Sequence, residues 1–113
     1  MMSNNEIDTY IYVIGWDTNG PVKIGYTADP ERRLAQLQTA QPNPLQIFYT
    51  RDVEPERARL MEGLVHKVNR RHKINGEWYN LSVDDAIAEI EMAFIQWGDK
   101  PLNKHNIKNL KIY

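Results

Sequence analysis

The sequence predicts a small α+β domain in which helices flank a three-stranded antiparallel sheet. An apolar, β-branched run at 7–14 is followed by the turn-forming segment 17–21 and a second such run at 22–26, the pattern of a β-hairpin. Residues 45–50 alternate as a third strand does. Segments with helical spacing separate and follow these strands, which gives the order β-β-α-β-α-α.

The first helix is expected to begin at Pro30, after the hairpin. Asp29 or Thr27 offers an N-cap side chain there, and proline is favoured at the first helical position. Leu34 and Leu37 lie three residues apart and give this helix its apolar side. The helix should end before the proline-containing segment that precedes the third strand.

Two further helices are expected in the second half of the chain. One opens at 54–56, and its apolar positions at helical spacing are Ala58, Met61, Leu64, Val65 and Val68. The other follows a short extended segment at 77–81, with Ser82 as its cap. Its expected buried stripe consists of Ala86, Ile87, Ile90, Ala93, Phe94 and Trp97.

The length of 113 residues predicts one domain, which we place at 1–97 and follow with a polar tail at 98–113 of open conformation. No apolar run approaches the roughly 20 residues that a membrane helix requires, and the first residues do not resemble a signal peptide. The sequence contains no cysteine, which excludes disulfide-linked partners and cysteine zinc sites. A cytoplasmic location is therefore expected.

The formal net charge is −1 and the pI is near 6.3, so no general attraction to nucleic acid is expected. Cations nevertheless gather locally, at Lys67, Arg70, Arg71 and Lys73. We interpret these four residues, together with Arg32, as candidate nucleic-acid-binding residues. A solvated helix face is the alternative interpretation of such a run.

Several short segments occur in an order that resembles the GIY-YIG nuclease superfamily. Tyr10-Ile11-Tyr12 and Lys23-Ile24-Gly25 are similar to its two signature tripeptides. The Lys-Ile-Gly form resembles the phage-type branch, also catalogued with the meiotically up-regulated (MUG) domain. The other matching positions, in chain order, are Tyr26, Thr27, Arg32, Arg33, Leu34, Glu62, His66, Gly76, Glu77, Trp78 and Tyr79.

The resemblance implies an endonuclease that hydrolyses DNA. Tyr12 would help to deprotonate the attacking water, although a free tyrosine has a pKa near 10 and needs nearby cations to act as a base. Lys23 replaces the second signature tyrosine and would hold a phosphate as a point charge. Arg33 would neutralise charge on the phosphate, because its guanidinium fits two phosphate oxygens. Each residue taken alone is equally consistent with an ordinary strand or helix surface.

Glu62 matches the single acidic metal ligand of the superfamily, which implies Mg²⁺, with Mn²⁺ as an alternative. His66 lies one helical turn later and is interpreted as a base or as a partner of the carboxylate, although an ordinary i, i+4 pair is also consistent. The superfamily often carries a histidine where Leu37 stands here. Asn80 is the candidate for its late asparagine.

Two functions from different classes therefore remain. The first is a metal-dependent DNA endonuclease that uses a single divalent ion. The second is a catalytically inactive module that binds nucleic acid or protein on the same fold, which the missing histidine and Lys23 favour. Trp78 is expected to anchor the core rather than to stack on a base. A phage or prophage origin and a homo-oligomer or partner protein are left open.

Overall fold

The computed structural model describes residues 8–97 of the chain. In chain order its elements are β1 (Thr9–Gly15), β2 (Val22–Thr27), α1 (Pro30–Gln38), β3 (Gln46–Val53), α2 (Pro55–Val68), the 3₁₀ turn η1 (Arg70–His72), β4 (Lys73–Asn75), β5 (Trp78–Tyr79) and α3 (Val83–Trp97). The strands form one antiparallel sheet in the order β3-β1-β2-β5-β4. The predicted α+β class with an antiparallel sheet is confirmed.

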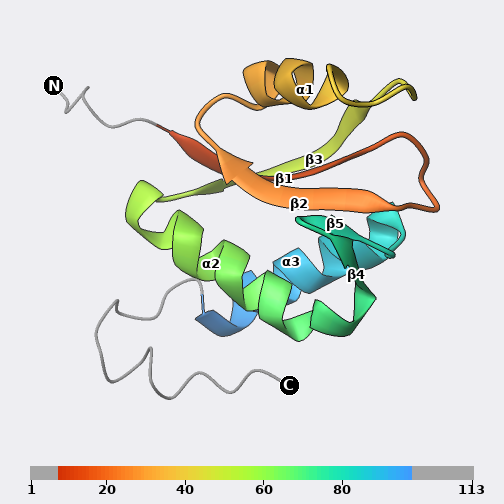
Figure 1. Ribbon diagram of the computed structural model, residues 1–113. Helices are drawn as coiled ribbons and strands as arrows, with labels where there is room; N and C mark the ends of the chain where they lie inside the picture. The colour runs from red at the N-terminus through yellow and green to blue at the C-terminus, as the bar shows by residue number, and fades with distance from the viewer. Residues whose placement is uncertain (1–7, 98–113) are drawn as a thin grey trace, which may run out of the picture.

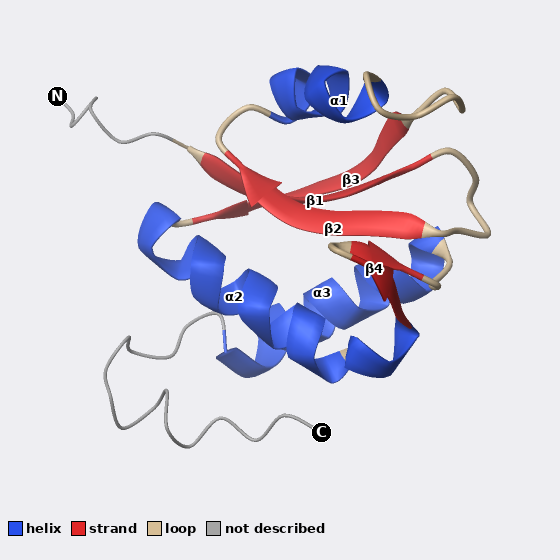
Figure 2. Cartoon of the chain, in the orientation of Figure 1, coloured by secondary structure: helices blue, strands red, loops and turns tan. Residues whose placement is uncertain are grey.

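Three layers make up the domain (Figure 1). Helix α1 lies on one face of the sheet, and helices α2 and α3 lie on the opposite face. Figure 2 shows the same arrangement by element type, with the sheet between the two helical layers. Among residues 8–97, no helix is long and apolar enough to cross a membrane.

The alternation of side chains along the central strands divides the core between the two faces. Ile11, Val13 and Ile24 are fully buried and pack in the larger cluster with Met61 of α2 and Ile90 of α3. The smaller cluster lies on the α1 side. Its buried residues are Tyr12, Ile14 and Leu45, with Trp16, Leu34, Leu37, Ile47 and Trp78 packed against them.

The predicted number of strands was wrong, because within residues 8–97 the sheet contains five strands rather than three. The additional strands, β4 and β5, span three and two residues. β5 lies within the short extended segment expected at 77–81, whereas the three residues of β4 carry too little side-chain alternation to be detected from sequence. β4 and β5 pair with each other around a turn at Gly76, whose φ of 57° favours glycine. β5 also pairs with β2 at Val22 and Lys23.

The predicted helix starts agree with the structure. Asp29 caps α1, because its side chain accepts a hydrogen bond from the Arg32 backbone N–H at 3.1 Å. Ser82 caps α3 in the same way through Asp85. Of the apolar positions named for α2, Val68 is exposed at the last turn, where the chain bends into η1.

Two earlier predictions lie outside the described residues. They are the polar tail at 98–113 and the start of the first apolar run at residue 7. The division into a domain at 1–97 and a tail stays a prediction.

Candidate active site at the edge of strand β2

Tyr12 of β1 lies over Gly25 of β2, its direct partner in the antiparallel register. Both residues face α1. A Cβ atom added at Gly25 would lie 2.4 Å from the Tyr12 hydroxyl oxygen and 2.6 Å from the adjacent ring carbon. The tyrosine ring therefore occupies the space above the glycine that any other residue would fill. The structure gives a physical reason for the glycine at this motif position, because a side chain there would collide with the phenol of Tyr12.

Arg33 comes from the first turns of α1 and reaches down to the same point. Its Nε donates a hydrogen bond to the Tyr12 hydroxyl oxygen at 3.1 Å. The hydrogen bond to Tyr12 raises the pKa of Arg33, so the guanidinium stays charged. Burial raises the pKa of Tyr12, while its hydrogen bond with Arg33 opposes that rise. Tyr12 is thus a protonated phenol near neutral pH, held by a permanent cation.

The side chains of Arg32 and Arg33 point in different directions from α1. Arg33 is half-buried and directed at the sheet, whereas Arg32 is exposed. This difference follows from the helical period, which turns adjacent side chains about 100° apart. The sequence prediction that Arg33 rather than Arg32 faces the site agrees with this geometry.

Lys23 lies two residues before Gly25 on the same face of β2 and is buried. Its ammonium nitrogen is 3.6 Å from the Glu77 Oε1 atom and 5.7 Å from the centre of the Trp78 ring. The second distance is within the range of a cation–π contact. The ion pair of Glu77 is thus with Lys23.

Glu62 and His66 reach the site from the opposite face of the sheet, along the open edge of β2. Beyond Lys23, β2 has no strand partner on this side, so its backbone groups need other hydrogen bonds. His66 Nε2 bonds to the Ile24 carbonyl oxygen at 3.0 Å, and the Tyr26 backbone N–H bonds to the Glu62 carboxylate. The helix rises about 6 Å from Glu62 to His66, and β2 spans about 6.6 Å from Ile24 to Tyr26. The spacing of the two helical side chains therefore matches the spacing of the two backbone groups that they bond.

The carboxylate of Glu62 is electrostatically unfavourable in the metal-free protein. Burial, followed by the charge of Glu77, raises its pKa to about 7. Lys23 and the hydrogen bond from Tyr26 lower that pKa and only partly offset the rise. A group that needs a further positive charge to be ionised at neutral pH is suited to bind a cation.

His66 uses both ring nitrogens within the protein. Nε2 donates to a carbonyl oxygen, so in the neutral ring Nδ1 is the acceptor, and it lies against the Tyr79 hydroxyl. Burial lowers the pKa of His66, which favours this neutral form. Burial also raises the pKa of Tyr79 to about 12, so its phenol keeps the proton that it donates. Of the two roles predicted for His66, the geometry favours a partner that positions the helix over a free base.

The remaining predicted nucleic-acid-binding residues do not surround Tyr12. Lys67, Arg70 and Arg71 lie at the end of α2 and in η1, where they line a surface hollow of about 330 Å³ with His72 and Glu89. Lys73 opens β4 and is exposed. These cations are exposed on the α2 side of the sheet, whereas Arg32 lies on α1, and the charge of Lys73 acts on His66. Their role in binding nucleic acid stays a prediction.

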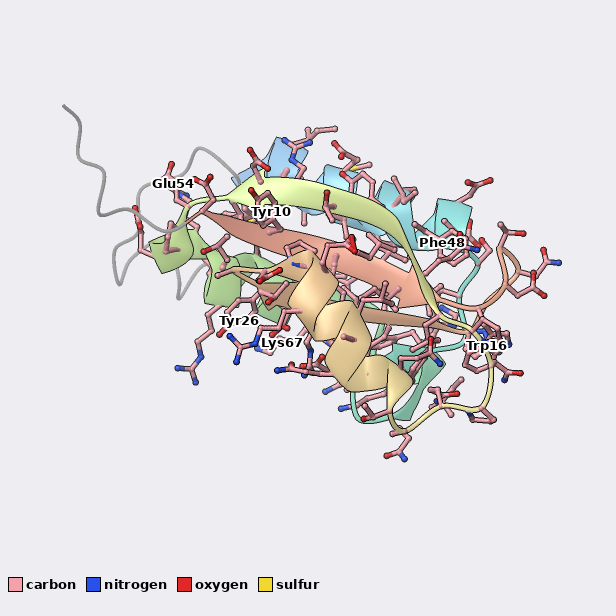
Figure 3. The ribbon with its side chains drawn as sticks, turned by 90° about the horizontal axis from the view of Figure 1, so that it is seen from above. Tyr10, Trp16, Tyr26, Phe48, Glu54 and Lys67 are labelled. Atoms are coloured by element: carbon pink, nitrogen blue, oxygen red, sulfur yellow. The ribbon has the colours of Figure 1, made fainter. Side chains whose placement is uncertain are left out.

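The motif residues around the site have mostly structural positions. Figure 3, viewed from the α1 side, shows Trp16 and Tyr26 at opposite ends of the β1–β2 hairpin. The Trp16 and Trp78 rings lie 5.5 Å apart, and both pack on the smaller cluster as expected for a core anchor. Thr27 accepts a hydrogen bond from the Asp29 backbone at the start of α1. Tyr10 is half-buried, and Asn80 is exposed.

The sequence placed Glu77 among the motif residues but did not predict its contact with Lys23. The charge of Glu77 acts on Tyr12, Arg33, Glu62 and His66, so it lies close to all four. The signal available in the sequence was the Gly76-Glu77 pair, which indicates a turn that presents a carboxylate. Within residues 8–97, no group of three or more His, Asp or Glu side chains is arranged to hold a metal ion by itself.

The space above Gly25 gives a direct test of the Tyr12 position. Gly25→Ala forces the new Cβ into the tyrosine, so we expect the free energy of unfolding to fall by about 1–3 kcal/mol. Gly63→Ala is the matched control, because Gly63 is at an exposed position of α2 and no atom lies within 4 Å of its added Cβ. That variant should gain about 0.5–1 kcal/mol of stability. Urea unfolding measures both, and equal stabilities would contradict this geometry.

The raised pKa of Glu62 predicts a dependence of stability on pH. Because the folded pKa of about 7 exceeds the ordinary value of 4.5, the stabilising effect is complete below pH 4.5 and lost as pH rises through 7. Relative to Glu62→Gln, the wild-type protein should lose on the order of 3 kcal/mol of unfolding free energy between pH 4.5 and 8. Urea unfolding in EDTA at both pH values measures this, and parallel pH profiles would exclude it.

Comparison with protein families identifies a domain that covers most of the sequence. The model of the T5orf172 domain matches residues 9–94, which include all five predicted catalytic residues and Glu77. Searches among curated proteins and among solved structures found no match. Since the matched region spans most of the sequence, from the first residue of β1 into the last turn of α3, the chain belongs to the T5orf172 domain family.

Proposed function

We propose that this protein is a metal-dependent DNA endonuclease of the GIY-YIG type. The observation that carries the proposal is the hydrogen bond from Arg33 to Tyr12 above Gly25, with Lys23 and Glu62 at the same strand. Two cations and a phenol around one point suit an anionic, tetrahedral group such as a phosphodiester. The link between the T5orf172 domain family and endonucleases supports this proposal.

The phosphate would be held by the groups that face α1. Besides the N–H directed at Tyr12 and the one that reaches Gln36, Arg33 has further guanidinium donors, and these would bond to non-bridging phosphate oxygens. The Lys23 ammonium adds a second positive charge. These fixed cations would stabilise the negative charge that accumulates on the phosphate during attack. Electrostatic stabilisation of this kind is usually the largest contribution to catalysis in such a site.

Hydrolysis requires that a water oxygen bond to phosphorus while the bond to the 3′ oxygen breaks. The proton lost by water has to be accepted, and the leaving oxygen finally gains one. Tyr12 would accept the first of these protons, but burial keeps its phenol protonated in the free protein. It would act as a base only when surrounding cations lower its pKa, the direction in which Arg33 already acts.

Glu62 is the proposed ligand of one divalent ion, and its surroundings fit that group. The carboxylate is largely buried and close to a second carboxylate, Glu77. Because no triad of protein ligands is present in residues 8–97, most remaining positions would be filled by water and phosphate oxygens, as Mg²⁺ prefers. Such an ion polarises the phosphate and stabilises the leaving oxygen. Mn²⁺ is the alternative ion.

A second candidate function is a nucleic-acid- or protein-binding module without turnover. It is favoured by the two engaged ring nitrogens of His66 and by the protonated state of Tyr12, because neither side chain is then a free base in the free protein. In that case Arg32, Lys67 and the cations of η1 would carry the binding. A cytoplasmic location, a phage or prophage origin and self-association stay predictions.

The first experiment compares the wild-type protein with Glu62→Gln on supercoiled plasmid and on branched DNA, in Mg²⁺, Mn²⁺ or EDTA. We expect wild-type nicking in either metal, none in EDTA, and at least a hundredfold loss of rate in the variant, because the ion would lose its ligand. Agarose gel electrophoresis measures the nicked product.

Glu56→Gln is the matched control, because it removes the same charge from the exposed first turn of α2. It should cleave as the wild-type protein does. Binding of DNA by the wild-type protein with no cleavage in any metal would replace the endonuclease by the binding module. Equal rates for the wild-type protein and Glu62→Gln would remove Glu62 from the metal site.

A further inference from the structure

The Glu77 carboxylate lies among groups that recognise an anion. Its Oε1 atom is 3.6 Å from the Lys23 ammonium nitrogen. The same atom would be 2.9 Å from a Cβ added at Gly25, and the Tyr12 hydroxyl oxygen would be 2.4 Å from that Cβ. The carboxylate and the phenol therefore border one small space above β2, which is also the space proposed for the phosphate.

The charges around this space explain why a carboxylate rests there. Arg33 and Lys23 are fixed cations that face the α1 side of β2, and the negative charge of Glu77 helps to raise the pKa of Arg33. Carboxylates and phosphates are both anionic hydrogen-bond acceptors that lysine and arginine bind in similar ways. In the free protein Glu77 therefore takes the position of an anion that the site is built to hold.

The backbone of Glu77 is fixed while its side chain is free to turn. Its carbonyl oxygen accepts a hydrogen bond from the Ile24 N–H at 3.2 Å, next to the short β5 strand. The side chain is 38% exposed, whereas that of Lys23 is 11% exposed. A rotation about the side-chain bonds of Glu77 would carry its carboxylate into water without moving the strand. Lys23 would stay in place beside Trp78.

We propose that Glu77 is a positioning residue that holds Lys23 in the free protein and yields it to a DNA phosphate on binding. This inference rests on the proposed function, because it needs a phosphate to enter the site. Glu77 fixes the ammonium group beside Tyr12 before DNA arrives. Glu77 also competes with the DNA phosphate for Lys23. DNA that does not displace the Glu77 carboxylate therefore binds weakly.

Competition has a consequence that simple charge repulsion lacks. If Glu77 only repelled DNA, its effect on affinity would be the same with or without Lys23, and the two substitutions would be additive. If it competes for Lys23, then Lys23 contributes more to DNA affinity after Glu77 has been removed. The attraction between two unit charges 4 Å apart in water corresponds to about a fivefold change in affinity.

The test is a double-mutant cycle of Glu77→Gln and Lys23→Met, with Kd measured by fluorescence anisotropy on a short labelled duplex in EDTA. We expect Glu77→Gln to bind about fivefold more tightly than the wild-type protein. Lys23→Met should weaken binding by no more than about twofold alone and by about tenfold in the Glu77→Gln background. Lys23→Gln replaces Lys23→Met if the latter does not fold, as judged by circular dichroism.

Glu56→Gln serves again as the charge-matched control and should leave Kd unchanged within about twofold. Additive effects in the cycle would overturn the competition while leaving the endonuclease intact, since cleavage is measured separately on plasmid. Failure of every variant to bind DNA would overturn both this inference and the proposed function.

Discussion

The open edge of β2 is the constraint on which the rest of the site depends. A strand without a neighbour has N–H and C=O groups that need partners, and only the first residues of β2 are paired by β5. The α2 side chains Glu62 and His66 supply the missing hydrogen bonds to Tyr26 and Ile24. The helix thereby acts as the next strand would, and it brings an acidic side chain to the edge.

The proposed chemistry depends on the side chains that lie over Gly25 on the α1 side of β2. Gly25 leaves room for the Tyr12 ring, and the ring places its hydroxyl under the guanidinium of Arg33. The carboxylate of Glu62 therefore approaches from the edge, while the phenol and the cations approach from the α1 side. Burial raises the pKa values of both Tyr12 and Glu62. A cation that enters the site would lower both pKa values and so favour the ionised side chains.

Much of this arrangement could be predicted from the sequence, because several elements carry local signals. The hairpin, the Asp29 cap and the helical spacing of α2 each depend on neighbouring residues alone. The extended segment expected at 77–81 contains β5, but its pairing with β2 and with the three-residue β4 could not be predicted, since strands this short form only through such pairing. The ion pair of Lys23 with Glu77 depends on that pairing, and its partners lie 54 positions apart in the chain. Long-range contacts of this kind have no local signature.

The central claim is that the side chains above Gly25 hold a phosphodiester for cleavage, and Arg33 tests it most directly. The measurement is the single-turnover rate of DNA cleavage by Arg33→Lys, with excess protein, beside Arg32→Lys on the same helix turn. Lysine keeps the charge but not the forked donors, so Arg33→Lys should lose about a hundredfold in rate, while Arg32→Lys stays within about twofold of the wild-type rate. An Arg33→Lys rate equal to that of the wild-type protein would contradict the claim.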